Sequence, residues 1–137
     1  MVHALEVIHN LLKPDGFLLD IRPSGEPPPL EVSLGENYYL AGWLNEEDDY
    51  IEYLQADEAL QTVVERGLFV VEKKGTFTFN TYAGSLEELR EYLQKDWEDA
   101  ILEDQVAGRV EDLWRSPLKD KELIVREIGK ISRLRPL

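Results

Sequence analysis

The chain has 137 residues, a formal net charge of −13 and no cysteine, with 43% hydrophobic and 31% charged residues. These values are typical of one globular domain over residues 1–137. The absence of cysteine excludes disulfides and thiol catalysis and fits the reducing cytoplasm, which is the expected location. The acidic charge argues against nucleic acid as a partner, and no apolar run reaches the roughly 20 residues of a membrane helix, so no membrane partner is expected.

The N-terminal segment predicts a helix that leads into a strand. Apolar residues recur at helical spacing over residues 2–12, and Pro14 and Gly16 predict a turn at the end of the helix. Residues 17–21 (FLLDI) form an apolar run without alternation, which is typical of a strand buried on both faces of a sheet. The proline-rich residues 22–29 predict an extended loop.

The middle of the chain alternates strand and helix signals. Residues 30–44 predict a hairpin or two short strands, and residues 45–67 predict a helix with acids in its first turn and Gly67 at its C-terminal cap. Residues 68–82 hold two β-rich runs on either side of residues 73–75 (KKG), which predicts a second hairpin.

The last part of the chain predicts a long helix and a final strand. Residues 84–115 carry a helical stripe, with Ser85 and Glu88 in a capping box and a break near Gly108. Residues 121–136 predict the strand. Together the elements predict an α+β fold, in which a mixed sheet with an antiparallel hairpin packs against about three helices.

The segment LLKPDGFLLDI (residues 11–21) resembles part of the class I S-adenosylmethionine-dependent methyltransferases. In that family a helix that ends in an LKPGG-like turn leads into the fifth strand of a doubly wound sheet. Here Leu12 to Gly16 fill that turn, with Asp15 where the family usually has Gly. The later helix and terminal antiparallel strands fit the C-terminal half of the family, so the resemblance implies a partial methyltransferase-like sheet. The order of the elements matches the family over most of the chain, but the sequence motif matches it only over residues 5–22.

The donor-binding half of that family is missing from this sequence. The family holds the methyl donor through a Gly-rich turn, and none of the nine glycines falls in G-x-G-x-G or G-x-G-x-x-G. The resemblance therefore implies no cofactor and no catalytic residue in this chain. The resemblance implies only where a substrate would lie. In the family, substrate groups lie beyond the carboxyl end of the fifth strand, and in this chain that position points to Asp20 and Arg22. The alternative is that both are ordinary residues at the start of a loop, paired with each other or solvated.

No metal site is expected. His3 and His9 fall on opposite faces of the first helix, so they cannot share an ion. The acids at residues 46–52 lack the Asp-x-Asp-x-Asp-Gly spacing of a calcium loop and are expected to be helix-start charges.

Two features point to a protein partner. Tyr38, Tyr39 and Trp43 form a dense aromatic cluster, which is typical either of a core or of an interface or ligand pocket. A partial sheet also exposes the edge and the apolar side chains of its inner strand, so we expect a homo-oligomer or a partner protein to cover them. The basic residues 129–137 either contact an acidic partner or form the solvent face of the last strand.

Three functions are compatible with the sequence. The leading one is a non-catalytic, methyltransferase-like interaction or ligand-binding domain. The second is a methyltransferase subunit completed by a separate donor-binding chain or dimer mate, with S-adenosylmethionine as cofactor; a neighbouring gene for a Gly-rich chain would favour it. The third is an acidic decoy that mimics nucleic acid, which requires salt-sensitive binding to basic proteins.

Overall fold

The computed structural model describes residues 1–48 and 50–137 and confirms the α+β class. In these residues four helices accompany a five-stranded, mostly antiparallel sheet and a small two-stranded sheet. The larger sheet has the order β1-β7-β2-β3, and β5 also pairs with β7. No helix among the described residues combines the length and the apolar character needed to cross a bilayer.

The chain divides into two compact units, and each has its own hydrophobic core. The first unit, here called unit 1, comprises Met1–Gly25, Ile51–Phe77 and Ile128–Leu137; unit 2 comprises Glu26–Tyr50 and Thr78–Glu127. The organisation of residues 1–137 as a single domain stays a prediction.

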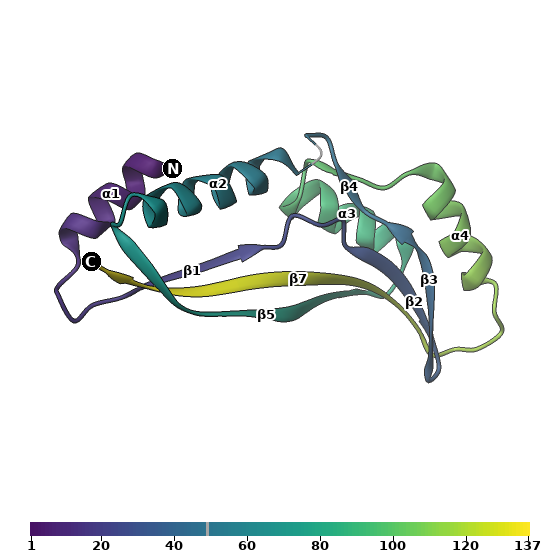
Figure 1. Cartoon of the computed structure of the whole chain (residues 1–137). Helices are drawn as coiled ribbons and strands as arrows, with labels where there is room; N and C mark the ends of the chain where they lie inside the picture. The colour runs from purple at the N-terminus through teal and green to yellow at the C-terminus, as the bar shows by residue number, and fades with distance from the viewer. Residues whose placement is uncertain (49) are drawn as a thin grey trace. The chain divides into compact units, whose positions relative to one another are not determined.

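Unit 1 packs two helices on one side of three strand segments (Figure 1). Its elements are α1 (Val2–Leu11), β1 (Leu18–Pro23), α2 (Ile51–Glu65), the first part of β5 (Phe69–Ala83) and the last part of β7 (Lys121–Pro136). Leu5 of α1, Val63 of α2 and Leu134 of β7 are buried together in its core. Gly67 has φ 75° after the end of α2, so the predicted helix end is confirmed.

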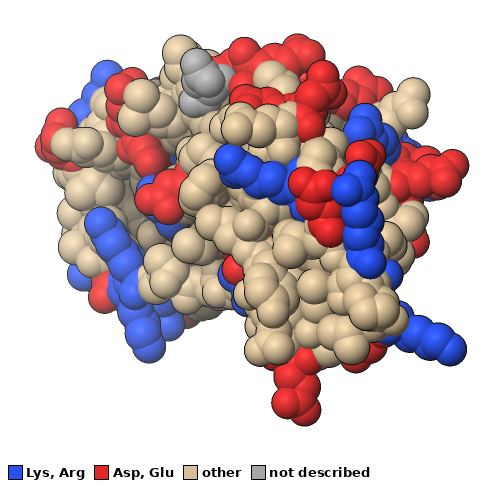
Figure 2. Space-filling view, turned by 90° about the vertical axis from the view of Figure 1, so that its right-hand side faces the viewer, with Lys and Arg blue, Asp and Glu red and all other residues tan. Residues whose placement is uncertain are grey.

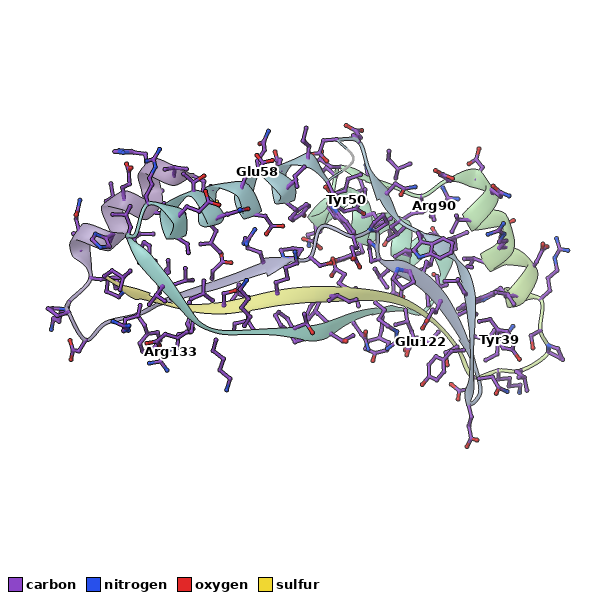
Figure 3. The ribbon with its side chains drawn as sticks, in the orientation of Figure 1. Tyr39, Tyr50, Glu58, Arg90, Glu122 and Arg133 are labelled. Atoms are coloured by element: carbon purple, nitrogen blue, oxygen red, sulfur yellow. The ribbon has the colours of Figure 1, made fainter. Side chains whose placement is uncertain are left out.

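Strand β1 is buried on one face only. It pairs antiparallel with β7, with Leu18 opposite Leu134 and Leu19 opposite Arg133. Leu19 and Ile21 are 49% and 58% exposed. Paired residues share a face of the sheet, and Arg133 points to the side of the strands away from α1 and α2 (Figure 3). The expectation of a strand buried on both faces is therefore wrong, because helices cover only one face of β1.

The predicted hairpin over residues 68–82 is also wrong. This segment is one continuous strand, β5, in which Gly75 is an ordinary strand residue. A Cβ atom at Gly75 would lie 3.6 Å from Cγ2 of Ile131 on β7, so the local sequence runs alongside β7 instead of folding back on itself.

Unit 2 contains the predicted first hairpin. Its elements are β2 (Pro29–Leu34), β3 (Asn37–Trp43), β4 (Asn45–Glu46), α3 (Leu86–Asp96), β6 (Ala100–Ile101) and α4 (Asp104–Trp114), with the remaining parts of β5 and β7. Strands β2 and β3 pair antiparallel across a turn at Gly35, which has φ 62°. Leu30 and Val32 of β2 meet Leu123 of β7 in the core.

Two helix boundaries differ from the predicted ones because β4 pairs with β6. The helix predicted to start at residue 45 begins at Ile51, since residues 45–46 are a strand. The long helix predicted over residues 84–115 breaks at Trp97, whose Nε1 donates a hydrogen bond to Glu46 at 2.8 Å. The expected break near Gly108 is wrong, because Gly108 lies inside α4.

The capping box at the start of α3 is present in a slightly shifted form. Oγ of Ser85 accepts a hydrogen bond from the Glu88 amide at 3.1 Å, as predicted. The Glu88 carboxylate accepts from the Gly84 amide at 3.1 Å, one residue before the cap. These bonds satisfy amide groups that the first helical turn leaves without partners.

Candidate functional site

A cleft of about 770 Å³ lies in unit 1 between α2 and strands β1, β5 and β7. Its volume is within the range of roughly 300–1,000 Å³ that is usual for ligand pockets. The helical side is a polar stripe, Asp57, Gln61 and Glu65, next to Leu60 and Val64. These residues are three or four positions apart, so they share one face of α2.

The strand side of the cleft comes from three strands. Arg22 of β1 lies opposite Lys130 of β7, and Asp20 lies opposite Ser132. Cross-strand partners point to the same face, so all four side chains point to one side of the sheet. Arg22, Lys130 and Ser132 line the cleft, and β5 adds Val71, Lys74, Gly75 and Thr76.

An ion-pair network spans one end of the cleft. Nε of Arg22 lies 2.9 Å and 2.8 Å from the two carboxylate oxygens of Asp20. Its Nη1 lies 2.8 Å from Oδ1 of Asp57, whose Oδ2 is 3.3 Å from the ammonium of Lys130. Burial by itself lowers the pKa of Arg22, but bonds to the carboxylates outweigh this effect and raise the pKa above its ordinary value. The network therefore fixes Arg22 as a charged, positioned wall of the cleft.

Two polar groups in the cleft have no such partner. Ser132 is 8% exposed and its hydroxyl bonds to no described residue, but among the described residues the fully buried side-chain atom without a partner is Oδ1 of Asn80. Lys74 lines the cleft and has no ion pair to any described residue. In contrast, Glu65 accepts a hydrogen bond from Gln61 at 2.7 Å. An uncommitted hydroxyl and ammonium are thus available in the cleft.

The predicted substrate residues are brought together, but in different roles. Asp20 and Arg22 are paired with each other, which is what the alternative interpretation expected. Arg22 also lines the cleft, whereas Asp20 does not line it and accepts hydrogen bonds from Arg22. Their assignment to a ligand stays a prediction.

The aromatic cluster lies on β3 of unit 2 and is not part of a core. Tyr38, Tyr39 and Trp43 are 61%, 43% and 49% exposed. Tyr39 is labelled at the β3 edge in Figure 3, and a wide area without charged side chains faces the viewer in Figure 2. Nη1 of Arg109 donates to the Ala41 carbonyl at 3.2 Å, so part of the β3 backbone is already bonded.

Sequence reasoning missed the residues that make Arg22 part of a cleft. Asp57 and Ser132 were not singled out from the sequence, and Lys130 was considered only among the basic residues 129–137, as a contact for an acidic partner or as the solvent face of the last strand. The available signal was their spacing: Lys130 and Ser132 share a strand face, and Asp57 begins a polar stripe with period four on α2. Only the pairing of β1 with β7 shows that these segments meet.

Unit 2 holds a partly buried acid, Glu127. Burial raises the pKa of Glu127, and the charge of Glu46 raises it further. A more open hollow of about 640 Å³ lies near Trp43 and Arg109 in the same unit. Among the described residues no three His, Asp or Glu side chains come together as metal ligands.

Comparisons of the chain with protein-family models, with curated proteins and with solved structures find no match. The side chains of the unit 1 cleft and the exposed strand β1 therefore carry the functional conclusion.

Proposed function

We propose that this chain is a ligand-binding domain without catalysis of its own, and that the unit 1 cleft holds a small organic molecule. The observation that carries the proposal is the cleft of about 770 Å³, in which the polar side chains of Arg22, Lys74 and Ser132 line the same space. Leu60, Val64 and Val71 add the apolar wall that ligand pockets usually have.

The same geometry favours binding over nucleophilic chemistry. A serine nucleophile needs a neighbouring base to accept its proton. Lys130 is on the same strand face as Ser132, but its ammonium is engaged by Asp57 at 3.3 Å. This contact commits the Lys130 side chain to Asp57.

The methyltransferase resemblance remains part of the proposal, as ancestry. It is supported by β1, which follows the turn at residues 12–16 and pairs antiparallel with the terminal strand β7. We propose that the domain binds its ligand without S-adenosylmethionine. Titration of the chain with S-adenosylmethionine in a calorimeter should give no saturable heat; micromolar binding would contradict this and favour the subunit hypothesis.

A neutral amphiphile tests the cleft without presupposing the charge of its ligand. Titration of ¹⁵N-labelled protein with 1-octanol should give saturable shifts of amides in α2 and β5 around the cleft. Val64→Glu should abolish them because it places a charge in the apolar wall. Val7→Glu is the matched control, since Val7 is 43% exposed on α1 and does not line the cleft. Absence of saturable shifts, or equal binding by both variants, would overturn the proposal.

A second candidate function, self-association, is favoured by β1. This strand pairs only with β7 among the described strands, so its other edge is free, and Ile21 is 58% exposed. An antiparallel pairing with a second copy, centred on Ile21, places Asp20 of each copy opposite Arg22 of the other. This arrangement is both two-fold symmetric and charge-complementary.

Light scattering coupled to gel filtration tests self-association. We expect a dimer whose fraction rises with protein concentration and falls with Ile21→Arg, which sets two like charges opposite each other. Val7→Arg is the control for an added surface charge. A monomer at every concentration would exclude this candidate and leave the cleft proposal untouched.

A further inference from the structure

We infer that two β1-paired dimers pack face to face through the bare side of the unit 1 sheet, so that four copies of the chain form a tetramer. The inference rests on the self-association proposed above and adds a second contact surface to it. It depends on three features: where the apolar side chains lie, how the β1 pairing arranges two copies, and how much area each contact buries.

Large apolar side chains gather on the side of the unit 1 sheet that α1 and α2 leave bare. Leu19 and Ile21 of β1 lie there, 49% and 58% exposed. Arg133 also points to this side (Figure 3), and its guanidinium carbon lies 4.1 Å from the ring centre of Phe17. Phe17 is therefore the third apolar side chain on the bare side of the sheet.

The fourth apolar side chain comes from β5. A Cβ atom at Gly129 would collide with the ring of Phe77, so Phe77 covers Gly129 on the strand face that Gly129 shares with Arg133. Nε of Arg133 lies 3.1 Å from Oε2 of Glu72, so packing over these side chains leaves Arg133 with its carboxylate. The four side chains are here called the apolar face: Phe17, Leu19, Ile21 and Phe77.

The β1 pairing brings the apolar faces of two copies together without covering them. Arg22 points to the helical side of the sheet, where it meets Asp57 of α2. Paired residues share a face, so an Asp20–Arg22 pairing between copies places the helices of both copies on one side of the joined sheet. Both apolar faces then lie on the other side, next to each other across Ile21, and remain in water.

The joined apolar face is too large to stay exposed, whereas that of one copy is not. Large apolar side chains have roughly 150–250 Å² of surface, so four that are about half exposed present roughly 400 Å². A patch of this size is ordinary for a monomer, but the roughly 800 Å² of a dimer is not. Two single copies packed face to face would bury only roughly 800 Å² in total, whereas two dimers would bury roughly 1,600 Å², the usual size of a specific interface.

A second dimer also fits the geometry of the sheet. Two sheets with apolar inner sides pack about 10 Å apart, with their side chains interdigitated. The helices of both dimers would then lie on the outside of the assembly. Every copy would make the same edge and face contacts, so the assembly closes at four copies.

Light scattering coupled to gel filtration separates the two contacts. We expect the wild-type chain to reach the mass of a tetramer as its concentration rises, and Leu19→Glu to stop at the dimer. The new carboxylate lies opposite Arg133 in its own copy and opposite Pro23 across the β1 pairing. It therefore charges the apolar face while the fold and the edge contact remain. Ile21→Arg should give a monomer.

Val7→Glu is the matched control, because Val7 is 43% exposed on α1, outside the apolar face, and gains the same charge. It should form the wild-type tetramer. A wild-type chain that stops at the dimer would overturn the inference and leave self-association standing. A tetramer in Leu19→Glu, or loss of the tetramer in both glutamate variants, would overturn it too. A monomer at every concentration would exclude both the tetramer and the dimer and leave the cleft proposal untouched.

Discussion

Replacement of Asp20 by Asn tests the ion-pair network that shapes the cleft. The Asp20 and Arg22 side chains are 10% and 15% exposed, and Nε of Arg22 lies within 2.9 Å of both carboxylate oxygens. Asn keeps the shape of the side chain but removes its charge and one acceptor. The guanidinium then remains mostly buried, with Asp57 as its only carboxylate in the described structure.

The expected loss follows from the burial of this pair. A hydrogen bond between charged groups contributes about 1.5–3 kcal/mol, and removal of one partner from a fully buried pair costs about 3–5 kcal/mol. Asp57 is 39% exposed and still compensates part of the Arg22 charge. We therefore expect Asp20→Asn to lower the free energy of unfolding by about 2 kcal/mol, near the lower end of these ranges.

Urea unfolding measured with two probes provides the assay. All three tryptophans, Trp43, Trp97 and Trp114, belong to unit 2, so tryptophan fluorescence follows unit 2 and far-UV circular dichroism follows both units. The loss should be visible in the dichroism. Glu6→Gln is the control in unit 1, because the Glu6–Arg66 pair is 38% and 56% exposed. It should cost only about 0.5 kcal/mol.

A double-mutant cycle isolates the pair itself. Asp20→Asn and Arg22→Met together should cost less than the sum of the two single changes, because the second change removes the unpaired charge. Additive costs would refute the reasoning. So would an Asp20→Asn loss no larger than that of Glu6→Gln.

Three further predictions concern unit 2, with unfolding followed by tryptophan fluorescence. Burial raises the pKa of Glu127 above its ordinary value of 4.5, so its charged form lowers stability above that raised pKa; Glu127→Gln should stabilise the fold at neutral pH, with the gain lost as the pH falls through the raised pKa to 4.5. A gain that persists in acid would contradict this. Ser85→Ala should cost about 1 kcal/mol by removing the cap on the Glu88 amide, and an unchanged midpoint would argue against the cap. Gly42→Ala should cost about 1–3 kcal/mol, because its Cβ would lie 2.6 Å from Val106; a neutral result would show that Val106 can move aside.

Local patterns predicted the elements whose ends depend on nearby residues. The strands within residues 30–44, the helix end at Gly67 and the final strand from Lys121 were all recognisable, because alternation and cap geometry need particular residues at particular positions. Strand β5 was misread for the opposite reason. Its KKG segment is compatible with a turn, and only the distant strand β7 keeps it extended.

The candidate site was predictable only in part. Asp20 and Arg22 were found through the turn that precedes β1, and the structure adds their partner Asp57. Asp57 and Lys130 come from distant segments that the strand register and helix packing bring to Arg22. Nothing in the sequence near Ser132 indicates that this residue is buried, since burial depends on the whole of unit 1.

Contacts between bound 1-octanol and individual methyl groups test ligand binding in the cleft most directly. Intermolecular nuclear Overhauser effects should connect the octanol chain to the methyl groups of Leu60, Val64 and Val71, which line the cleft. They should not connect it to Leu19 or Ile21 on the exposed face of β1. Contacts with Leu19 and Ile21 alone, or no intermolecular contacts at all, would contradict the assignment of the cleft as the binding site.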